Sequence, residues 1–190
     1  MDLTKIAFLL LLAGVGLERL LELQLSRRHQ QKLASSGALK HGDPQYRWMI
    51  ALHTGVLIGA AVEVTALYRP FIPWLAFPAL VLFALATGLR WWVIRTLGIH
   101  WNTEVVDSAR LGVVSDGPFR WIRHPNYLGV FVELIALPLI HTAWITAIFA
   151  AVGDIFVLRN RLSIEERLLD AVPAYRAAMA GKPRFLPRIF

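Results

Sequence analysis

The sequence predicts an all-α integral membrane protein with about five transmembrane helices, a class favoured by its composition, its hydropathy and the spacing of its apolar segments. The chain has 190 residues, of which 56% are hydrophobic and only 17% are charged. Its mean hydropathy is +0.52. A soluble domain of this length has too little interior to bury so much apolar surface. The length fits a single domain over residues 1–190.

The apolar residues form five segments separated by polar or proline-containing connections. These segments are residues 3–25, 45–68, 74–97, 127–140 and 142–158. The last two are joined near Pro138 and His141, which predicts a tight helical hairpin. We expect the spans of residues 1–84 to support a binding core formed by residues 85–190. The tail after the hairpin has a helical pattern to about Met179.

The first apolar segment is expected to be retained, because no small-residue cleavage site precedes Glu18 and Arg19. Arg19 lies three residues before Glu22, so an ion pair within the first helix is possible. Residues 26–44 are expected to form a polar loop after this span.

Basic residues concentrate in three regions, and this asymmetry predicts the orientation. The loop 26–44 has four Lys or Arg residues, the stretch 95–123 also has four, and the tail from Arg159 has seven. The two remaining connections hold only Arg69 and His141. Because short cytoplasmic segments carry an excess of positive charge, the sequence predicts a cytoplasmic C-terminus and a cytoplasmic site. The expected location is a bacterial inner membrane.

The composition also limits the partners. The formal charge is +7, and its position beside apolar segments favours anionic lipid headgroups over nucleic acid. The absence of cysteine excludes a disulfide framework and a thiol nucleophile. The six histidines show no paired spacing, so we expect no metal site. The oligomeric state is not predicted.

The most distinctive stretch runs from Gly117 to Gly129. It holds two arginines, a histidine, two prolines and three aromatic residues in thirteen positions. Pro118 and Pro125 fix φ and lack an N–H donor, so they fit turns or first helical turns. Because an apolar run begins at Leu128, the stretch predicts a rigid entry to a membrane helix, with polar side chains at the bilayer surface.

A second polar group, Arg161, Glu165 and Glu166, follows the last apolar segment. Arg161 and Glu165 are four residues apart and share one helix face. Such a pair of glutamates alone is typical of a solvated face, but its position opposite the proline-containing stretch favours a site. Arg90 lies inside an apolar span, where an arginine usually faces a cavity or a partner and less often extends to the interface.

These two motifs, flanking a helical hairpin, resemble the isoprenylcysteine carboxyl methyltransferase family of integral membrane enzymes. The resemblance covers roughly residues 85–180. It rests on Gly117-Pro118-Phe119-Arg120, on Arg123-His124-Pro125-Asn126-Tyr127-Leu128-Gly129 and on Arg161-Leu162-Ser163-Ile164-Glu165-Glu166. The N-terminal half looks more like a bacterial branch of the family that is associated with methylation of polyketide alkylpyrones.

The resemblance implies S-adenosyl-L-methionine as cofactor, a lipophilic or lipidated substrate, and Arg161 and Arg90 as substrate contacts. A short strand-like stretch at residues 111–114 is expected to contribute backbone contacts to the cofactor. Phe119 and Glu104 stand where the family usually has tyrosine and glutamine. The implied cofactor contacts are Glu104, Leu111, Gly112, Val113, Val114, Phe119, His124, Pro125, Asn126, Tyr127, Glu165 and Glu166.

The expected function is methyl transfer from this cofactor to an oxygen, a carboxylate or an acidic hydroxyl, such as that of a prenylcysteine or an alkylpyrone. Such a transfer needs an in-line approach, a held cofactor and a site that excludes water. Three alternatives stay open. They are a phospholipid N-methyltransferase, a membrane sterol-type reductase that uses NADPH and shares the Arg-His-Pro-x-Tyr motif, and a non-catalytic lipid-binding protein.

Overall fold

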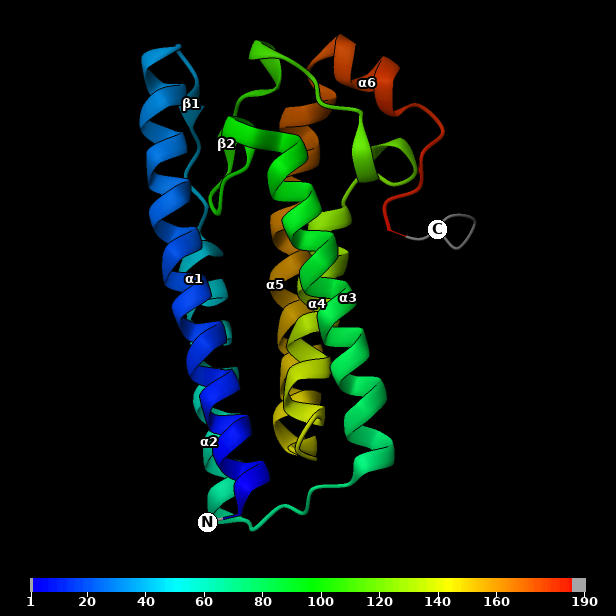
Figure 1. The fold of residues 1–190 in the computed structure, drawn as a ribbon. Helices are drawn as coiled ribbons and strands as arrows, with labels where there is room; N and C mark the ends of the chain where they lie inside the picture. The colour runs from blue at the N-terminus through cyan, green and yellow to red at the C-terminus, as the bar shows by residue number, and fades with distance from the viewer. Residues whose placement is uncertain (1, 186–190) are drawn as a thin grey trace.

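The computed structural model describes residues 2–185, which form a bundle of five helices of unequal length with their axes along the bundle (Figure 1). A sixth, short helix lies across one end of the bundle. The helices are α1 (Leu3–Ser35), α2 (Tyr46–Ala66), α3 (Pro73–Leu97), α4 (Pro125–Leu139), α5 (Trp144–Asp170) and α6 (Pro173–Met179). The structure therefore confirms the all-helical class.

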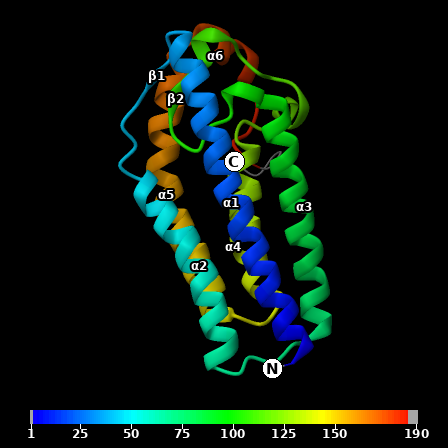
Figure 2. The same ribbon diagram turned by 60° about the vertical axis from the view of Figure 1, so that its left-hand side comes forward.

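The polar connections gather at the end of the bundle that carries α6, whereas the N-terminus and the α2–α3 and α4–α5 connections lie at the opposite end (Figures 1 and 2). The short elements at the α6 end are β1 (Leu39–Lys40), η1 (Gly98–His100), β2 (Val106–Asp107), η2 (Ala109–Leu111) and η3 (Gly117–Arg120). The two strands pair antiparallel, with Leu39 opposite Asp107. This pairing ties the α1–α2 connection to the α3–α4 connection.

Two helices continue beyond their apolar segments. The first continues to Ser35, so the expected loop 26–44 is helical over its first part. Its composition favours this, because arginine, glutamine, lysine, leucine and alanine are good helix formers. Ser26, His29 and Leu33 are buried along one face, which supplies the packing that propensity alone does not. The helical pattern predicted for the tail to about Met179 is confirmed, because α5 continues past its apolar segment to Asp170 and α6 ends at Met179.

The prediction of a strand-like stretch at residues 111–114 is wrong. The 3₁₀-helix η2 ends at Leu111, and the only strand of this connection within the described residues is β2, at Val106–Asp107. Gly112 has φ 152°, a value that residues other than glycine rarely adopt, and this backbone conformation interrupts extended structure.

Within residues 2–185, two helical segments are long and apolar enough to cross a membrane. They are Tyr46–Ala66 and Pro73–His100, whereas Pro125–Leu139 is a shorter apolar helix. On α5, Ile148, Val152 and Phe156 are more than half exposed and point away from the bundle. Together with the two long apolar helices, these side chains indicate a membrane protein. The five-span topology stays a prediction.

Close packing of α3 against α4 depends on a glycine. A Cβ atom added at Gly129 would lie 2.6 Å from Cγ of Arg90 and 3.3 Å from the carbonyl oxygen of Ala86. The absence of a side chain at this position therefore lets Arg90 pass between the two helices. As a result, the buried arginine reaches the interior of the bundle at the level where α4 begins.

Candidate active site

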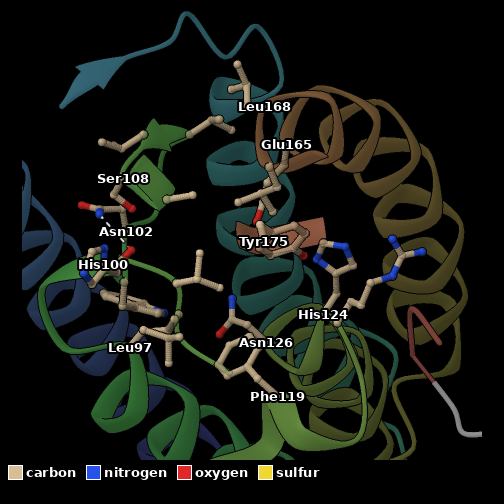
Figure 3. Close-up of a pocket in the computed structure, with 18 of the residues that line it drawn as sticks. Leu97, His100, Asn102, Ser108, Phe119, His124, Asn126, Glu165, Leu168 and Tyr175 are labelled. Carbon is tan, nitrogen blue, oxygen red and sulfur yellow. Dashed lines mark hydrogen bonds between the residues drawn. The ribbon is translucent and has the colours of Figure 1, made fainter. Parts of the chain in front are cut away.

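A cavity of about 150 Å³ lies at the α6 end of the bundle (Figure 3). Its walls come from the α3–α4 connection, the first turn of α4, the last turns of α5, and α6. Most of the predicted cofactor contacts border it: Glu104, Gly112, Val113, Val114, Phe119, His124, Pro125, Asn126, Tyr127 and Glu165, together with Arg161. Leu111 and Glu166 do not line this cavity.

The proline-containing stretch folds as expected into a rigid entry to α4. Pro118 lies in η3, and Pro125 occupies the first turn of α4. Gly117 has φ 55°, and a Cβ atom there would lie 2.6 Å from Oγ1 of Thr96. This turn therefore requires glycine, and it holds the segment tightly against the end of α3.

Tyr127, Arg161 and Glu165 form a hydrogen-bonded group that joins α4 to α5. Nε of Arg161 donates to the Tyr127 hydroxyl over 2.9 Å, and the same hydroxyl donates to Oε2 of Glu165. Nη2 of Arg161 donates to the carbonyl oxygen of Thr103 over 2.7 Å. Nη1 lies 3.5 Å from Oδ2 of Asp43. The buried guanidinium is thus held by three different segments.

Glu166 does not line the cavity, and its carboxylate contacts the ring of His124, which does. Nε2 of His124 lies 3.2 Å from Oε1 of Glu166. Arg184 makes a bidentate contact to the same carboxylate, with nitrogen–oxygen distances of 2.9 and 2.6 Å. The hydrogen bond with His124, followed by that with Arg184, lowers the pKa of Glu166 to about 2. Glu166 therefore orients a predicted contact residue and is not itself placed to touch a ligand.

The segment after α6 is a strap across the entry to α4. The backbone N–H groups of Arg123 and His124 donate to the carbonyl oxygens of Pro183 and Arg184, each over 2.9 Å. Nζ of Lys182 donates to the carbonyl oxygen of Phe119 over 2.8 Å. These contacts satisfy backbone donors at the start of α4 that have no partner within the helix. We use the term C-terminal strap for residues 181–185.

A second cavity, of about 230 Å³, lies between the helices next to the first. Its lining comes from α1, α2, α3, α4 and α5 and is mostly apolar. Leu20 and Ile50 line it and are 58% and 37% exposed, so the cavity reaches the outer surface between α1 and α2. Both cavities are bordered by the same five residues: Trp101, Asn102, Asn126, Tyr127 and Arg161. We call these five residues the port.

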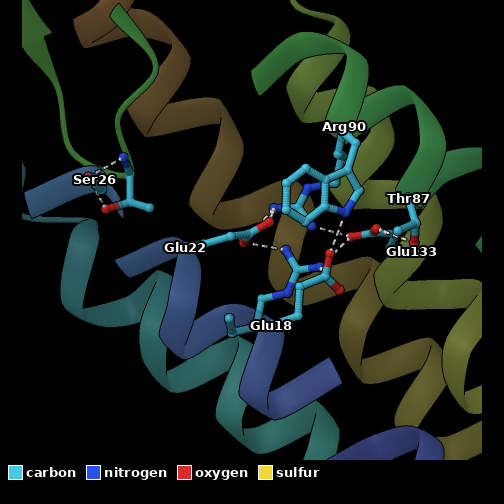
Figure 4. Close-up of polar contacts among 9 residues, drawn as sticks. Glu18, Glu22, Ser26, Thr87, Arg90 and Glu133 are labelled. Carbon is cyan, nitrogen blue, oxygen red and sulfur yellow. Dashed lines mark hydrogen bonds and ion pairs between the residues drawn. The ribbon is translucent and has the colours of Figure 1, made fainter. Parts of the chain in front are cut away.

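Arg90 lines the second cavity, but its guanidinium is committed to two carboxylates (Figure 4). Nη2 lies 2.8 Å from both carboxylate oxygens of Glu22, and Nη1 lies 2.9 Å from Oε2 of Glu133. Arg19 contacts Glu22 over 2.8 Å, which confirms the ion pair expected within the first helix, and it also contacts Glu133 over 3.2 Å. Thr87 donates to Glu133 over 2.6 Å. The charge of Arg90 is therefore balanced inside the protein.

Several lining residues had no clear signal in the sequence. His100, Trp101 and Asn102 lie in a connection whose path depends on tertiary contacts, such as that between Nδ1 of His29 and the Trp101 carbonyl oxygen, 2.8 Å apart. Tyr175, on α6, was expected only to be helical; it lines the first cavity, and burial raises the pKa of its hydroxyl. The described residues contain no group of three potential metal ligands.

The two long apolar helices and the paired cavities indicate a helical membrane protein in which a more polar cavity and a more apolar cavity meet at a port. Residues 79–171 match the sequence model of the isoprenylcysteine carboxyl methyltransferase (ICMT) family. The matched part of the chain carries both motifs, and its similarity to this family indicates a methyltransferase of that type. YpbQ, an uncharacterized protein of Bacillus subtilis (strain 168), is 29% identical over 164 residues, which cover 86% of this chain and 96% of YpbQ.

Proposed function

We propose that this protein transfers a methyl group from S-adenosyl-L-methionine to an oxygen of a lipophilic acceptor. The observation that carries the proposal is the port, where the more polar of two cavities and a mostly apolar cavity share five residues. Two substrates bound on opposite sides of this port would meet there. Such a meeting point is what group transfer between a polar cofactor and a lipid requires.

The first cavity has groups that fit the cofactor. Three buried polar atoms beside it have no hydrogen-bond partner within residues 2–185: Oδ1 of Asn102, Oδ1 of Asn126 and Nε1 of Trp101. The amide oxygens would accept from ribose hydroxyls or an ammonium group, and the indole N–H would donate to a carboxylate. Glu104 and Glu165 add carboxylates for the same hydroxyl and ammonium groups. When bound, S-adenosyl-L-methionine supplies an electrophilic methyl group on a sulfonium.

The chain would hold this cofactor by fixed groups. Glu104 borders the first cavity and is itself oriented by Nζ of Lys40, 2.7 Å away. Glu165 is oriented by the Tyr127 hydroxyl. His124 is fixed from behind by Glu166 and the C-terminal strap. Preorganised groups of this kind lower the cost of binding and hold the reacting atoms in line.

The second cavity would hold the acceptor, which we propose carries a carboxylate or an acidic hydroxyl, as a prenylcysteine or an alkylpyrone does. Leu20 and Ile50 mark the opening toward the bilayer, so a lipid tail can remain between α1 and α2. Arg161 borders both cavities and would orient the oxygen at the port. The α6 end of the bundle carries the basic connections, so we place it in the cytoplasm, at a bacterial inner membrane.

Cofactor binding tests the proposal most directly. We expect isothermal titration of the detergent-purified protein to show binding of S-adenosyl-L-methionine and none of NADPH. Glu165→Ala should abolish cofactor binding, whereas Arg161→Ala should mainly abolish turnover. Arg159→Ala, an exposed change on the same helix, is the control. Binding of NADPH alone would favour the reductase alternative and contradict the proposal.

Radiolabelled methyl transfer then identifies the acceptor. A prenylcysteine analogue, an alkylpyrone and phosphatidylethanolamine should each be offered in mixed micelles. We expect label on one of the first two. Label on phosphatidylethanolamine alone would show a phospholipid N-methyltransferase, and cofactor binding without any transfer would support a non-catalytic role.

A further inference from the structure

The α1–α2 connection, residues 36–45, contacts the port although it lies outside the segment that matches the family model. Its strand β1 pairs with β2, and the backbone N–H of His41 donates to the carbonyl oxygen of Val105 over 3.1 Å. Nζ of Lys40 lies 2.7 Å from Oε2 of Glu104. Since Glu104 and Val105 line the first cavity, the connection is bound directly to the wall of that cavity.

Asp43 belongs to this connection and reaches Arg161. Its side chain is fully buried, and Oδ2 lies 3.5 Å from Nη1 of Arg161. Oδ1 accepts from the backbone N–H of Gln45 over 2.9 Å, and the Asp43 carbonyl oxygen accepts from the N–H of Tyr46 over 3.1 Å. Oδ2 makes no hydrogen bond within residues 2–185, so it acts on the guanidinium through its charge. The turn thus holds one carboxylate oxygen and leaves the other facing Arg161.

The nitrogen atom of Arg161 that Asp43 faces also contacts a residue of the second cavity. Nε and Nη2 donate to the Tyr127 hydroxyl and the Thr103 carbonyl oxygen. Nη1 lies 3.0 Å from Sδ of Met49, which lines the second cavity. Because a thioether is a weak acceptor, an oxygen of a bound acceptor molecule would take its place on Nη1. Asp43 and the acceptor molecule would then share this nitrogen atom.

A guanidinium with a balanced charge suits methyl transfer to an anionic oxygen. The lone pair of that oxygen forms the bond to the methyl carbon, the carbon–sulfur bond breaks, and its electron pair stays on sulfur. No proton moves, and the negative charge on the oxygen decreases toward the transition state. A cation beside the oxygen therefore stabilises the ground state more than the transition state, which raises the barrier. A carboxylate beside the cation weakens this effect and leaves the guanidinium in place to orient the oxygen.

We propose that Asp43 is a positioning residue for methyl transfer, which holds Nη1 of Arg161 at the port and balances its charge. The inference rests on the function proposed above, with an acceptor that is a carboxylate or an ionised hydroxyl. Asp43 lines neither of the two cavities, so it acts through Arg161 and does not touch the acceptor. A turn with a structural role alone would be served equally by asparagine, which accepts from the same N–H and has no charge.

Binding of charged and neutral probes without methyl donor tests the charge balance. The probes are a prenylcysteine analogue and its methyl ester, and an alkylpyrone and its methyl ether, titrated into the detergent-purified protein at pH 7. Asp43→Asn and the smaller Asp43→Ser remove the charge and keep an acceptor for the Gln45 N–H. We expect both variants to bind the acid of a pair roughly threefold to tenfold more tightly than the parent protein, because Arg161 loses its counter-charge. Binding of the methylated partner should be unchanged.

Steady-state kinetics of methyl transfer tests the positioning role. We expect kcat to fall by about tenfold or more in both variants, because the anion is held more tightly in the ground state and less firmly in line. KM for the acceptor should fall together with kcat. The Kd of S-adenosyl-L-methionine should stay at the parent value. Damage to the turn alone would instead raise KM and weaken the binding of acid and methylated partner alike.

Asp116→Asn is the matched control, because it removes an exposed carboxylate from the α3–α4 connection and should change neither probe binding nor kcat. Thermal melts check the fold of each variant. Weaker or unchanged binding of the acid in both variants, or a kcat equal to that of the parent protein, would overturn the role of Asp43. Failure of both acids to bind the parent protein would overturn it as well.

These outcomes separate the inference from the proposed function. If the role of Asp43 is overturned, binding of S-adenosyl-L-methionine and methyl transfer by the parent protein still support the proposed function. Absence of cofactor binding would overturn the proposed function itself.

Discussion

Arg161 shows how a buried charge is tolerated where two cavities meet. Its guanidinium contacts the Tyr127 hydroxyl, the Thr103 carbonyl oxygen and the Asp43 carboxylate. Removing one member of such a group leaves a charge without compensation in a region of low polarity. The sequence predicted that Arg161 and Glu165 share a face, because four residues make about one helical turn. It did not reveal Asp43, because that contact depends on where the α1–α2 connection folds back.

The Glu166 carboxylate predicts how the stability of the protein falls at acid pH. Its pKa is lowered in the folded protein to about 2 from an ordinary value of 4.5. The stabilisation is therefore complete above pH 4.5 and is lost as pH falls toward 2. We expect the contribution of this group to be constant between pH 8 and 5 and to disappear below. Thermal melts across this range check the prediction.

Glu166→Gln is the matched variant for the acid series, because it keeps the shape of the side chain and removes the charge. The variant should be less stable than the parent protein at pH 7. The difference between the two should shrink as pH falls from 4.5 to 2. A constant difference down to pH 2 would show that the ion pairs of Glu166 do not contribute to this acid dependence.

Among the helices, the sequence predicted the interiors better than the ends. The predicted span 74–97 corresponds to α3 at Pro73–Leu97, because Pro73 and Gly98 mark its two ends. The end of α1 was missed, since this helix continues as a polar segment that is stabilised by contacts at the α6 end. The helical pattern of the tail was predicted, but not its division into the end of α5 and α6. The C-terminal strap was also missed, because backbone hydrogen bonds between distant segments leave no pattern in side-chain type.

The C-terminal strap gives a prediction about cofactor affinity. Arg184→Ala removes the bidentate contact to Glu166, which loosens the group that holds His124. We expect the affinity for S-adenosyl-L-methionine to fall by several-fold, with a smaller loss of thermal stability than Glu166→Gln gives, because Arg184 is half exposed and His124 still contacts the carboxylate. Isothermal titration measures this. Arg176→Ala, an exposed change on α6, should have no effect on affinity.

The contact between α3 and α4 gives a prediction about stability. Gly129→Ala would place a Cβ atom 2.6 Å from Cγ of Arg90, so either the helices or the buried arginine must shift. We expect a loss of about 1–3 kcal/mol, the usual cost of overpacking. Gly88→Ala is the control, because a Cβ atom there meets nothing within 4 Å. That change should be neutral or stabilise α3 by about 0.5–1 kcal/mol. Thermal unfolding in detergent should rank the control above the parent protein and Gly129→Ala below it.

At the scale of the whole molecule, the basic residues and the connections that border the cavities lie at the same end of the bundle. The three basic regions that the sequence assigned to one side lie together at the α6 end, with both cavities close to it (Figure 1). The α2–α3 and α4–α5 connections lie at the other end. This agreement follows from successive helices that run along the bundle in opposite directions, so that alternate connections lie toward opposite ends (Figure 1). The placing of the α6 end in the cytoplasm is a separate prediction, which rests on the excess of basic residues alone.

Because the chain has no cysteine, the predicted orientation can be tested with single cysteine substitutions. Ser36→Cys, just after α1, and Ala180→Cys, just after α6, should react with a membrane-impermeant maleimide only from the cytoplasmic side. Leu67→Cys, just after α2, should react only from the opposite side. All three positions are exposed, so each thiol is accessible to the reagent. Comparing right-side-out with inverted vesicles separates the two sides. Reaction of Ser36→Cys and Leu67→Cys from the same side would show that α2 does not cross the membrane, and the lipid-facing opening of the second cavity would then need another explanation.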